Sequence, residues 1–129
     1  MSFSITNTTT ARLPRVRFKK AKETVLGTRY ALSVVFVTPK KMRELNRVYR
    51  KKDAPTDILA FPLSESSGEI YLCLSEVKKK APLFGMSAAT YLPYLFVHGL
   101  VHLKGHDHGK KMDALEKKYC ALMKIPKPG

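Results

Sequence analysis

Acidic residues are scarce in this sequence of 129 residues, which has 10 aspartates and glutamates against 24 lysines and arginines. The formal net charge at neutral pH is therefore +14. Solubility alone requires far less charge than this, so the imbalance favours a polyanionic partner, RNA or DNA before a membrane surface. A generic basic surface exposed to solvent is the alternative interpretation.

Cysteine is also rare. The chain has two, Cys73 and Cys120, and they are too far apart in sequence to form a paired metal-binding or redox motif. This usage excludes the disulfide framework that is typical of small secreted domains. We therefore expect two reduced, buried thiols in a cytosolic protein.

Long hydrophobic runs are missing as well. The longest, Tyr91 to Leu103, is interrupted by Pro93 and two histidines and is too short to span a bilayer, so we expect a core helix. The first residues, Met1 to Ile5, lack both a basic start and a long apolar stretch, so we expect no signal peptide. These features predict a cytoplasmic protein with one domain over residues 1–129 and no membrane partner.

All four histidines lie within eleven residues, between His98 and His108. His98 and His102 are four residues apart, so on a helix they share one face and can bind the same metal ion. Gly105 follows where a helix commonly ends, and the chain can then turn back to supply a third imidazole, from His108 or His106. Three nitrogens and an open position are typical of a catalytic zinc site.

The spacing favours His108 as the third ligand, because it follows His98 by ten residues, the offset found in extended zincin motifs. His106 and Asp107 are then candidates for positions beside the ligands or facing a substrate. The glutamate that acts as general base in zinc peptidases is missing, because Gly99 follows the first histidine. This absence argues against proteolysis.

Hydrophobic periodicity predicts about four strands and five helices. The expected strands span residues 2–7, 31–37, 58–61 and 69–74, with the third stopped by Pro62 and the last two joined as a hairpin. The expected helices span residues 14–26, with Gly27 just past the end, and 39–50, a segment capped by Ser75, a histidine helix that begins after Gly85, and residues 112–123. This order predicts an α+β fold, a small mixed sheet covered by helices, with the metal site at the end of a central helix.

Several helix boundaries have a specific chemical signal. Thr38 is the expected N-cap of the helix over residues 39–50. This helix is expected to turn its apolar residues inward, namely Met42, Leu45, Val48 and Tyr49. The N-cap of the histidine helix is either Thr90, which places Pro93 in the first turn, or Ser87, which places Pro93 inside the helix and should kink it.

Two segments resemble signature blocks of the YbeY endoribonucleases, the bacterial rRNA maturation factors. One is the histidine segment from His98 to His108, and the other runs from Leu45 to Pro62. A third, weaker block is matched by Gly68-Glu69-Ile70. Two independent blocks in the right order make this resemblance, which covers residues from about 45 to 108, much more specific than the histidines alone.

The resemblance implies an endoribonuclease that needs one zinc ion and cleaves single-stranded RNA. It also implies a role in 16S rRNA 3′-end maturation and ribosome quality control, with ribosomal RNA and the small ribosomal subunit as partners and no nucleotide cofactor. By position, His98, His102 and His108 match the metal ligands, and Arg50 matches the catalytic arginine of the family's cleft. The candidate RNA-binding residues are the neighbouring lysines: Lys51, Lys52, Lys104, Lys110 and Lys111.

The sequence departs from the family pattern at a few positions, none of which is a metal ligand. Family members usually have tyrosine where His106 stands, serine at Ala60, aspartate at Glu69 and serine at Cys73. The general base is not identified by the sequence, so hydrolysis and transesterification through the RNA 2′-OH both stay open. Two alternatives from other classes are a zincin-like metallopeptidase and a non-catalytic RNA-binding module with a structural metal.

Overall fold

The computed structural model describes residues 3–105 and 109–128, so the predicted ligand His108 and its neighbours His106 and Asp107 lie outside the described residues. The strands are β1 (Phe3–Asn7), β2 (Ala31–Phe36), β3 (Ile58–Ser64) and β4 (Ser67–Leu72). The helices are α1 (Phe18–Leu26), α2 (Pro39–Arg50), α3 (Leu74–Lys80), the 3-10 helix η1 (Ala81–Phe84), α4 (Ala88–Leu103) and α5 (Lys110–Met123).

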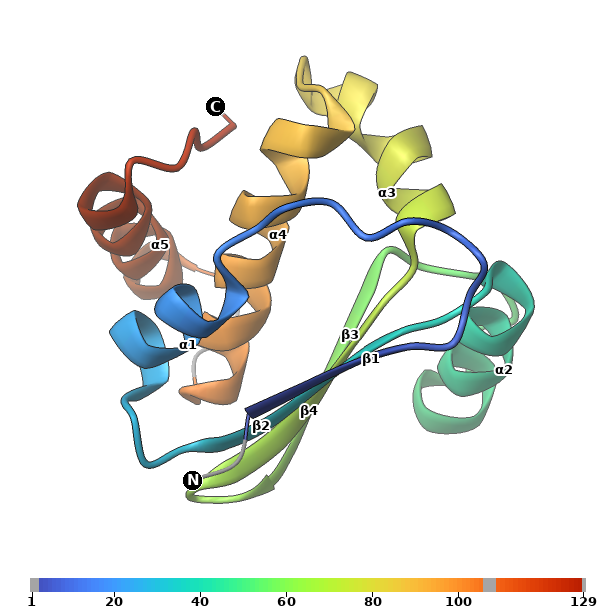
Figure 1. Cartoon of the computed structure of the whole chain (residues 1–129), viewed down its shortest axis with the longest axis horizontal. Coiled ribbons are helices and arrows are strands. Elements are labelled where there is room, and N and C mark those ends of the chain that lie inside the picture. The colour runs from blue at the N-terminus through green and yellow to red at the C-terminus, as the bar shows by residue number, and fades with distance from the viewer. Residues whose placement is uncertain (1–2, 106–108, 129) are drawn as a thin grey trace.

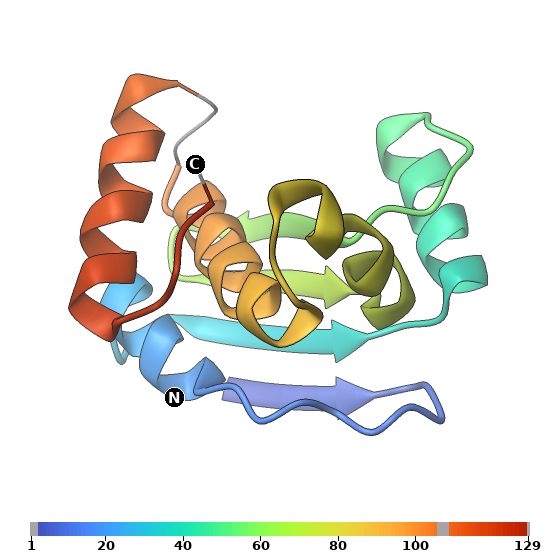
Figure 2. The ribbon, with the colours of Figure 1, turned by 90° about the horizontal axis from the view of Figure 1, so that it is seen from above.

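The four strands form one mixed sheet in the order β1-β2-β4-β3. The first three strands of this order are parallel, whereas β3 pairs antiparallel with β4 as the predicted hairpin. In Figure 1, α1, α3, α4 and α5 lie on one side of the sheet, and α2 lies on the other side, near one end of the strands. Seen from above in Figure 2, α4 runs over the sheet between α5 and α3. The predicted α+β class is confirmed.

The main hydrophobic core lies between the sheet and α4. Nine of the sixteen residues of α4 are buried, so this helix is apolar on most of its sides. Phe18 of α1 packs edge-on against both Phe36 of β2 and Phe96 of α4, with ring centroids 5.8 and 4.9 Å apart. Because α4 packs against both the sheet and α1, its orientation about its own axis is fixed, and so is the direction of its partly exposed face.

Both cysteines are buried and free, as the sequence predicted. Burial, followed by the nearby charge of Glu116, raises the pKa of the Cys120 thiol to about 11, so this thiol stays protonated at neutral pH. Within the described part of the chain, no helix has both the length and the apolar character that a membrane span requires.

The first helix is shorter than predicted, because α1 begins at Phe18 and not near Pro14. Since β1 and β2 are parallel, the chain must travel from the end of β1 back to the start of β2. An extended residue covers about twice the distance of a helical one, so residues 8–17 stay extended or irregular over part of this return path. The end of the helix at Leu26, just before Gly27, agrees with the prediction.

The third strand continues through Pro62 to Ser64, so the prediction that Pro62 stops it is wrong. β3 lies at the edge of the sheet, where half of the backbone N–H groups need no partner, and proline is tolerated there. A shift of register between Pro62 and Ser64 accommodates the irregularity. The strand that follows is displaced from residues 69–74 to Ser67–Leu72.

The third helix starts at Leu74, so Ser75 is not its N-cap. Cys73 takes that position with an extended backbone, and its carbonyl accepts the first helical hydrogen bond from the Val77 N–H at 3.0 Å. For α4, the alternative with Ser87 as the N-cap is the correct one: the Ser87 hydroxyl accepts from the Thr90 N–H at 3.3 Å. Pro93 therefore lies inside the helix.

The second helix has the predicted cap, since the Thr38 hydroxyl accepts from the Lys41 N–H at 3.2 Å. Its buried face is narrower than predicted, however, because α2 reaches only a small apolar cluster at the end of the sheet. Val48 and Tyr49 are 61% and 65% exposed, which contradicts their assignment as inward residues. Asn46 is buried instead and donates to the carbonyl of Ala54 at 2.8 Å.

Candidate functional site

Helix α4 presents His98 and His102 on one face, as their spacing predicted. Their rings lie with centroids 4.8 Å apart and planes nearly perpendicular, so two nitrogens can approach one point. The helix ends at Leu103, and Gly105 takes a left-handed backbone with φ +101°, which lets the chain leave the helix just after the histidines. Among the described residues, no group of three or more His, Cys, Asp or Glu side chains could hold a metal.

Glu116 of α5 holds the first histidine in place. Its Oε2 lies 2.7 Å from Nδ1 of His98, and its Oε1 accepts a hydrogen bond of 3.0 Å from the Tyr94 hydroxyl. Burial by itself raises the pKa of Glu116, but the hydrogen bond and charge of His98, together with the Tyr94 hydroxyl, hold that pKa below its usual value. The ionised carboxylate therefore accepts from Nδ1–H and leaves Nε2 of His98 as the nitrogen for a ligand.

This arrangement fits a divalent metal ion. A carboxylate that accepts from the far nitrogen of an imidazole fixes its tautomer and ring direction, as is common around zinc ligands. Imidazole nitrogen is a ligand that zinc prefers, and the perpendicular rings of His98 and His102 present two such donors at short range. The residues present thus fit two ligands of the predicted zinc site.

A second buried carboxylate, Asp57, connects three elements beside the histidines. Its Oδ2 accepts from the Tyr91 hydroxyl of α4 at 2.9 Å, and its Oδ1 lies 3.6 Å from Nζ of Lys80 at the end of α3. Burial, then the charge of Asp57, raises the pKa of Tyr91, so this phenol stays protonated and keeps donating. Asp57 therefore fixes the position of Lys80 relative to α4.

The side chains of Arg50, Lys80, His98 and His102 all line one cleft of about 390 Å³. Arg50 comes from the end of α2 and Lys80 from the end of α3, so two cations face the histidine pair. Phe84 of η1 also lines the cleft, is 48% exposed, and stacks on Tyr91 with ring centroids 5.3 Å apart. The cleft thus combines two imidazoles, two cations and an aromatic surface.

Gly99 is located where α4 touches the sheet. A Cβ atom at this position would lie 2.7 Å from Cδ1 of Ile58 on β3, closer than real contacts allow. The end of the Ile58 side chain would have to move to admit any side chain at this position, so the glycine lets α4 approach β3 closely. The glutamate that serves as the base of zinc peptidases is missing here, because glycine stands at its position.

The structure brings Arg50 together with His98 and His102, but it does not bring the five candidate lysines to the cleft. Among the described residues, none of these lysines lines it. Nζ of Lys104 donates to the carbonyl of Val25 on α1 at 3.1 Å. The remaining four are exposed beside α2 and at the start of α5: Lys51, Lys52, Lys110 and Lys111.

Sequence reasoning missed Glu116, Tyr94 and Lys80 as parts of the site. A signal for Glu116 existed, because it follows the inward residue Met112 by four positions and so shares the apolar face of α5. A charged residue on such a face needs a buried partner. No local pattern in the sequence singles out Tyr94 or Lys80 from other tyrosines and lysines.

Comparison with known proteins identifies relatives of the whole fold. The profile of one family, described as Endoribonuclease YbeY, matches residues 3–123. Two curated proteins with that name are similar to this chain. The one from Paraburkholderia phytofirmans is 34% identical over 128 residues, covering 92% of this chain and 84% of that protein. The one from Aquifex aeolicus is 39% identical over 97 residues, covering 70% of this chain and 64% of that protein.

Several other curated relatives are also matched over only part of their length. For two of them, from Geobacillus kaustophilus and Carboxydothermus hydrogenoformans, the match spans 60% and 57% of the relative. Among solved structures, a solution structure of a Thermotoga maritima protein is similar with a TM-score of 0.60 and 28% identity, covering 91% of this chain and 86% of that one. The profile match over residues 3–123 shows that this chain belongs to the YbeY endoribonuclease family.

Proposed function

We propose that this protein is a metal-dependent endoribonuclease that cleaves single-stranded RNA in the cleft of His98 and His102. The observation that carries the proposal is the meeting of two histidines with Arg50 and Lys80 in one cleft, where the Glu116 carboxylate holds the His98 ring. The relatives named as endoribonucleases support the same reaction class. Gly99 disfavours the peptidase alternative, because it stands where zinc peptidases have their glutamate base.

The proposed cofactor is one zinc ion, with His98, His102 and His108 as ligands. When bound, zinc would supply a Lewis acid for the cleavage of a phosphodiester. Glu116 keeps the His98 ring in one tautomer and direction, and Tyr94 fixes Glu116 in turn. The chain itself therefore determines the position of this ligand before any metal arrives.

Arg50 and Lys80 are the groups that would bind the scissile phosphate. The guanidinium of Arg50 can donate two parallel hydrogen bonds to phosphate oxygens and so stabilise the negative charge that grows in the transition state. Lys80 lies 3.6 Å from Asp57, which partly offsets its charge and limits its freedom. We assign Arg50 the larger role, because none of its side-chain nitrogens is in an ion pair within the described residues.

The preference for single strands follows from Phe84. An exposed ring beside two cations offers a surface on which an unpaired base can stack. The bases of a duplex are already stacked on one another and are not available for this contact. Ribosomal RNA at the 16S 3′ end, the small ribosomal subunit as partner and the bacterial cytoplasm as compartment are proposed on the family resemblance and on the charge of +14.

The test is single-turnover cleavage of a single-stranded RNA by zinc-loaded protein. Arg50→Ala should lower the rate by about 10²-fold or more, the scale of one lost preorganised donor. Arg50→Lys should restore only part of it, because an ammonium cannot form the two parallel bonds. Arg47→Ala is the matched control, since Arg47 is an exposed arginine of the same helix that does not line the cleft. Equal rates for Arg50→Ala and Arg47→Ala would remove Arg50 from the proposed mechanism.

The strand preference has its own test. Phe84→Ala should weaken single-stranded RNA binding about 10-fold, because stacking on an aromatic ring contributes about 1–3 kcal/mol per base. Leu83→Ala is the control, since Leu83 is the neighbouring exposed apolar residue and lies outside the cleft lining. Fluorescence anisotropy with labelled RNA gives both affinities. The same loss in the two variants would rule out a specific stacking role for Phe84.

A further inference from the structure

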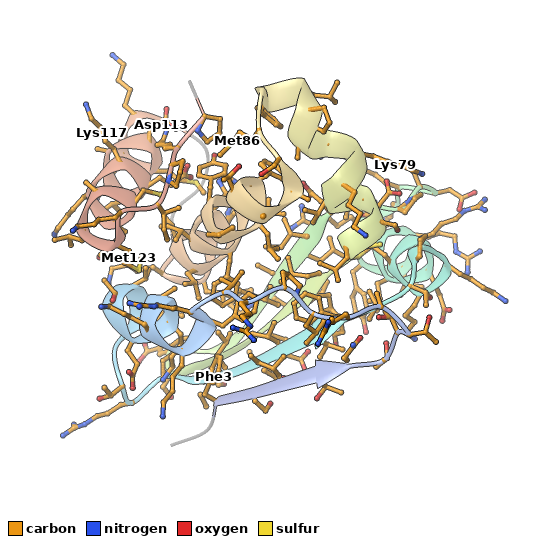
Figure 3. All side chains as sticks on the ribbon, turned by 45° about the horizontal axis from the view of Figure 1, so that its top comes forward. Phe3, Lys79, Met86, Asp113, Lys117 and Met123 are labelled. Carbon is orange, nitrogen blue, oxygen red and sulfur yellow. The ribbon has the colours of Figure 1, made fainter. Side chains whose placement is uncertain are left out.

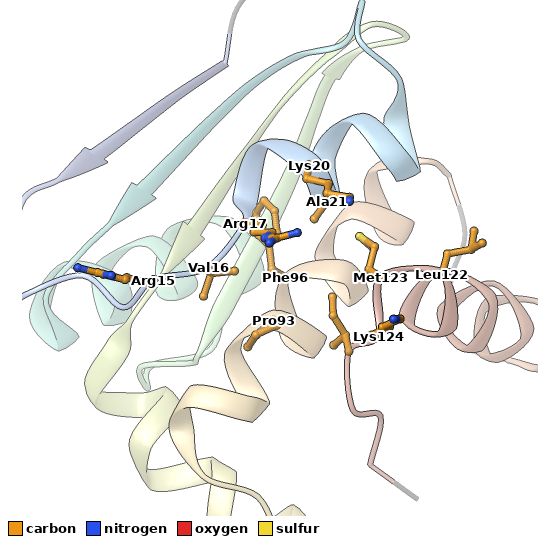
Figure 4. A pocket seen from close by; sticks show the side chains of 11 residues that line it. Arg15, Val16, Arg17, Lys20, Ala21, Pro93, Phe96, Leu122, Met123 and Lys124 are labelled. Carbon is orange, nitrogen blue, oxygen red and sulfur yellow. The ribbon is translucent and has the colours of Figure 1, made fainter.

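A second cavity, of about 400 Å³, lies on the other side of α4 from the histidine cleft. Pro93 and Phe96 of α4 line it, whereas Tyr94 and His98 of the same helix line the cleft. With 3.6 residues per turn, these two pairs occupy different faces of the helix. The remaining walls come from the segment before α1, from α1 itself and from the end of α5 (Figure 4).

The charge at this cavity has one sign. Its lining includes four cations and no acidic side chain: Arg15, Arg17, Lys20 and Lys124. All four are exposed, and within residues 3–105 and 109–128 none forms an ion pair. The histidine cleft differs, because its lining also contains the acidic residues Asp57, Asp113 and Glu116. Four unpaired like charges repel one another, so an anion between them would be stabilised.

The inner lining is apolar. It consists of Val16, Ala21, Pro93, Phe96, Met123 and Ile125. Figure 3 shows Met123 at the end of α5 next to α1, where the two helices meet. Leu122 at the rim is 64% exposed, an unusual position for a large apolar side chain. A cavity with an apolar lining and several cations is suited to a ligand that has an apolar body and negative charge.

We propose that this cavity binds a nucleotide of single-stranded RNA, at a site separate from the cleavage cleft. Phosphates would bind the four cations, and the base and ribose would lie against the apolar lining. A volume of about 400 Å³ is within the usual range for small-molecule sites. That the strand is RNA rests on the proposed function; that the ligand is a nucleotide chain rests on the cavity.

The distribution of the cations favours a chain of phosphates over a ligand with a single charged head. Figure 4 shows Arg15 well apart from Arg17, Lys20 and Lys124. A polynucleotide carries one charge per residue and can satisfy cations that are separated along its path, whereas a fatty acid can satisfy only one group of them. Arg17 adds a planar guanidinium, on which a base can stack.

The cavity and the histidine cleft are adjacent through α4. Pro93 and Tyr94, neighbours in that helix, line the cavity and the cleft respectively. The C-terminal segment adds positive charge to the cavity, because Lys124 lines it. A strand anchored in the cavity would therefore lie one helix away from the proposed cleavage site.

The test compares two triple variants that lose the same charge. Arg17→Ala/Lys20→Ala/Lys124→Ala removes the cations of the cavity. Arg29→Ala/Lys40→Ala/Lys117→Ala removes one arginine and two lysines that are exposed and line neither site. Figure 3 shows Lys117 on the outer side of α5. The ligand is a labelled single-stranded RNA of about 16 nucleotides, the longest stretch that one single-strand-binding domain usually covers. Its affinity for each variant is measured at several salt concentrations.

The cavity variant should bind at least about 10-fold more weakly than the control variant. The slope of the logarithm of the binding constant against the logarithm of the salt concentration should be less steep by about 2. Three phosphate contacts are lost, and each contact on a single strand contributes about 0.7 to the steepness. Methyl NMR of the methionines locates the site: adenosine monophosphate should shift the Met123 signal and leave Met42, which is buried in the other cluster, unchanged. Equal losses in the two variants, or a Met123 signal that responds to decanoate but not to the nucleotide, would overturn the proposal.

Cleavage is measured separately, with zinc-loaded protein and an RNA of about 4 nucleotides. This is the shortest stretch that one single-strand-binding domain usually covers, and it is too short to occupy both sites. If the protein cuts this RNA but the two triple variants bind the longer RNA equally well, the cavity site is wrong and the proposed function stands. If the protein cuts no RNA but only the cavity variant loses affinity, the binding site stands and the endoribonuclease assignment is wrong.

Discussion

Glu116 uses both of its carboxylate oxygens, one toward His98 and one toward Tyr94, while only 2% of its side chain is exposed. A carboxylate is costly to bury unless each oxygen has a partner. The two hydrogen bonds therefore explain why Glu116 is tolerated in the interior. The bond to Nδ1 also orients the His98 ring, which lines the cleft.

Replacing this carboxylate should weaken metal binding without unfolding the protein. Glu116→Gln should lower zinc affinity about 10- to 100-fold, the usual effect of changing the group that supports a ligating histidine. Glu44→Gln, which removes a carboxylate from an exposed ion pair with Lys41, should leave affinity unchanged. Zinc titration against a competing chelator measures both, with circular dichroism as the control for folding. Equal affinities would mean that Glu116 has a structural role only.

Sequence reasoning could predict the residues whose role depends on type and local spacing. His98 and His102 were identified in this way, since an interval of four residues on a helix has one geometric meaning. Glu116 could not be assigned, because its contact with His98 spans 18 residues and depends on how α5 docks. Whether His108 completes the set stays a prediction, because it lies outside the described residues.

Among the elements, α4 determines the position of the site, and Gly99 determines how closely α4 approaches the sheet. A methyl group added at this position would meet Cδ1 of Ile58 at 2.7 Å and Cδ1 of Ile70 at 3.4 Å, the second of which is an ordinary contact. A glycine inside a helix costs about 1 kcal/mol relative to alanine. At this position that cost is offset by close packing between α4 and β3.

This balance can be measured with a double-mutant cycle. Gly99→Ala alone should change the free energy of unfolding little, because the gain in helix propensity is offset by the clash with Ile58. In an Ile58→Val background, which lacks the clashing Cδ1 atom, the same change should be more favourable by about 1 kcal/mol. Urea denaturation gives the four stabilities. Ile5→Val, at the exposed edge strand, should show no coupling to Gly99→Ala; a purely additive cycle with Ile58 would contradict the packing argument.

The elements themselves were largely predictable, and the errors have tertiary causes. Thr38 caps its helix through its own side chain, a local interaction that the sequence contains in full. Pro62 was misjudged because the penalty for proline in a strand depends on whether the strand is at an edge. Residues 14–17 were misjudged because a helical pattern cannot show that the chain needs an extended return path between parallel strands.

On the scale of the whole molecule, the charge of +14 is not concentrated in the histidine cleft. The cleft lining contains two lysine or arginine side chains and three acidic ones, whereas the cavity behind α4 contains four cations and no acid. The order of strands that creates these two sides could not be predicted, because pairing between distant strands has no local signature. Composition predicted a polyanionic partner, and the fold adds where cations gather without acidic neighbours, which is where we propose that the partner binds.

The overall affinity for RNA should therefore depend strongly on ionic strength. Each phosphate contact on a single strand contributes about −0.7 to the slope of log K against log salt. With several contacts, affinity should fall at least about 10-fold between about 50 and 200 mM salt. Anisotropy titrations at four salt concentrations measure the slope. An affinity that is flat over this range would show that the basic surface does not serve RNA.

The link between His98 and Glu116 also has a consequence for the order of events during synthesis. The sheet and α4 are complete by residue 103, but the carboxylate that orients His98 belongs to a later helix. A nascent chain that has emerged only as far as α4 carries its histidines without their support. The surroundings of His98 are therefore completed only when α5 has left the ribosome and docked, and the same docking completes the main core with Met112, Tyr119 and Cys120.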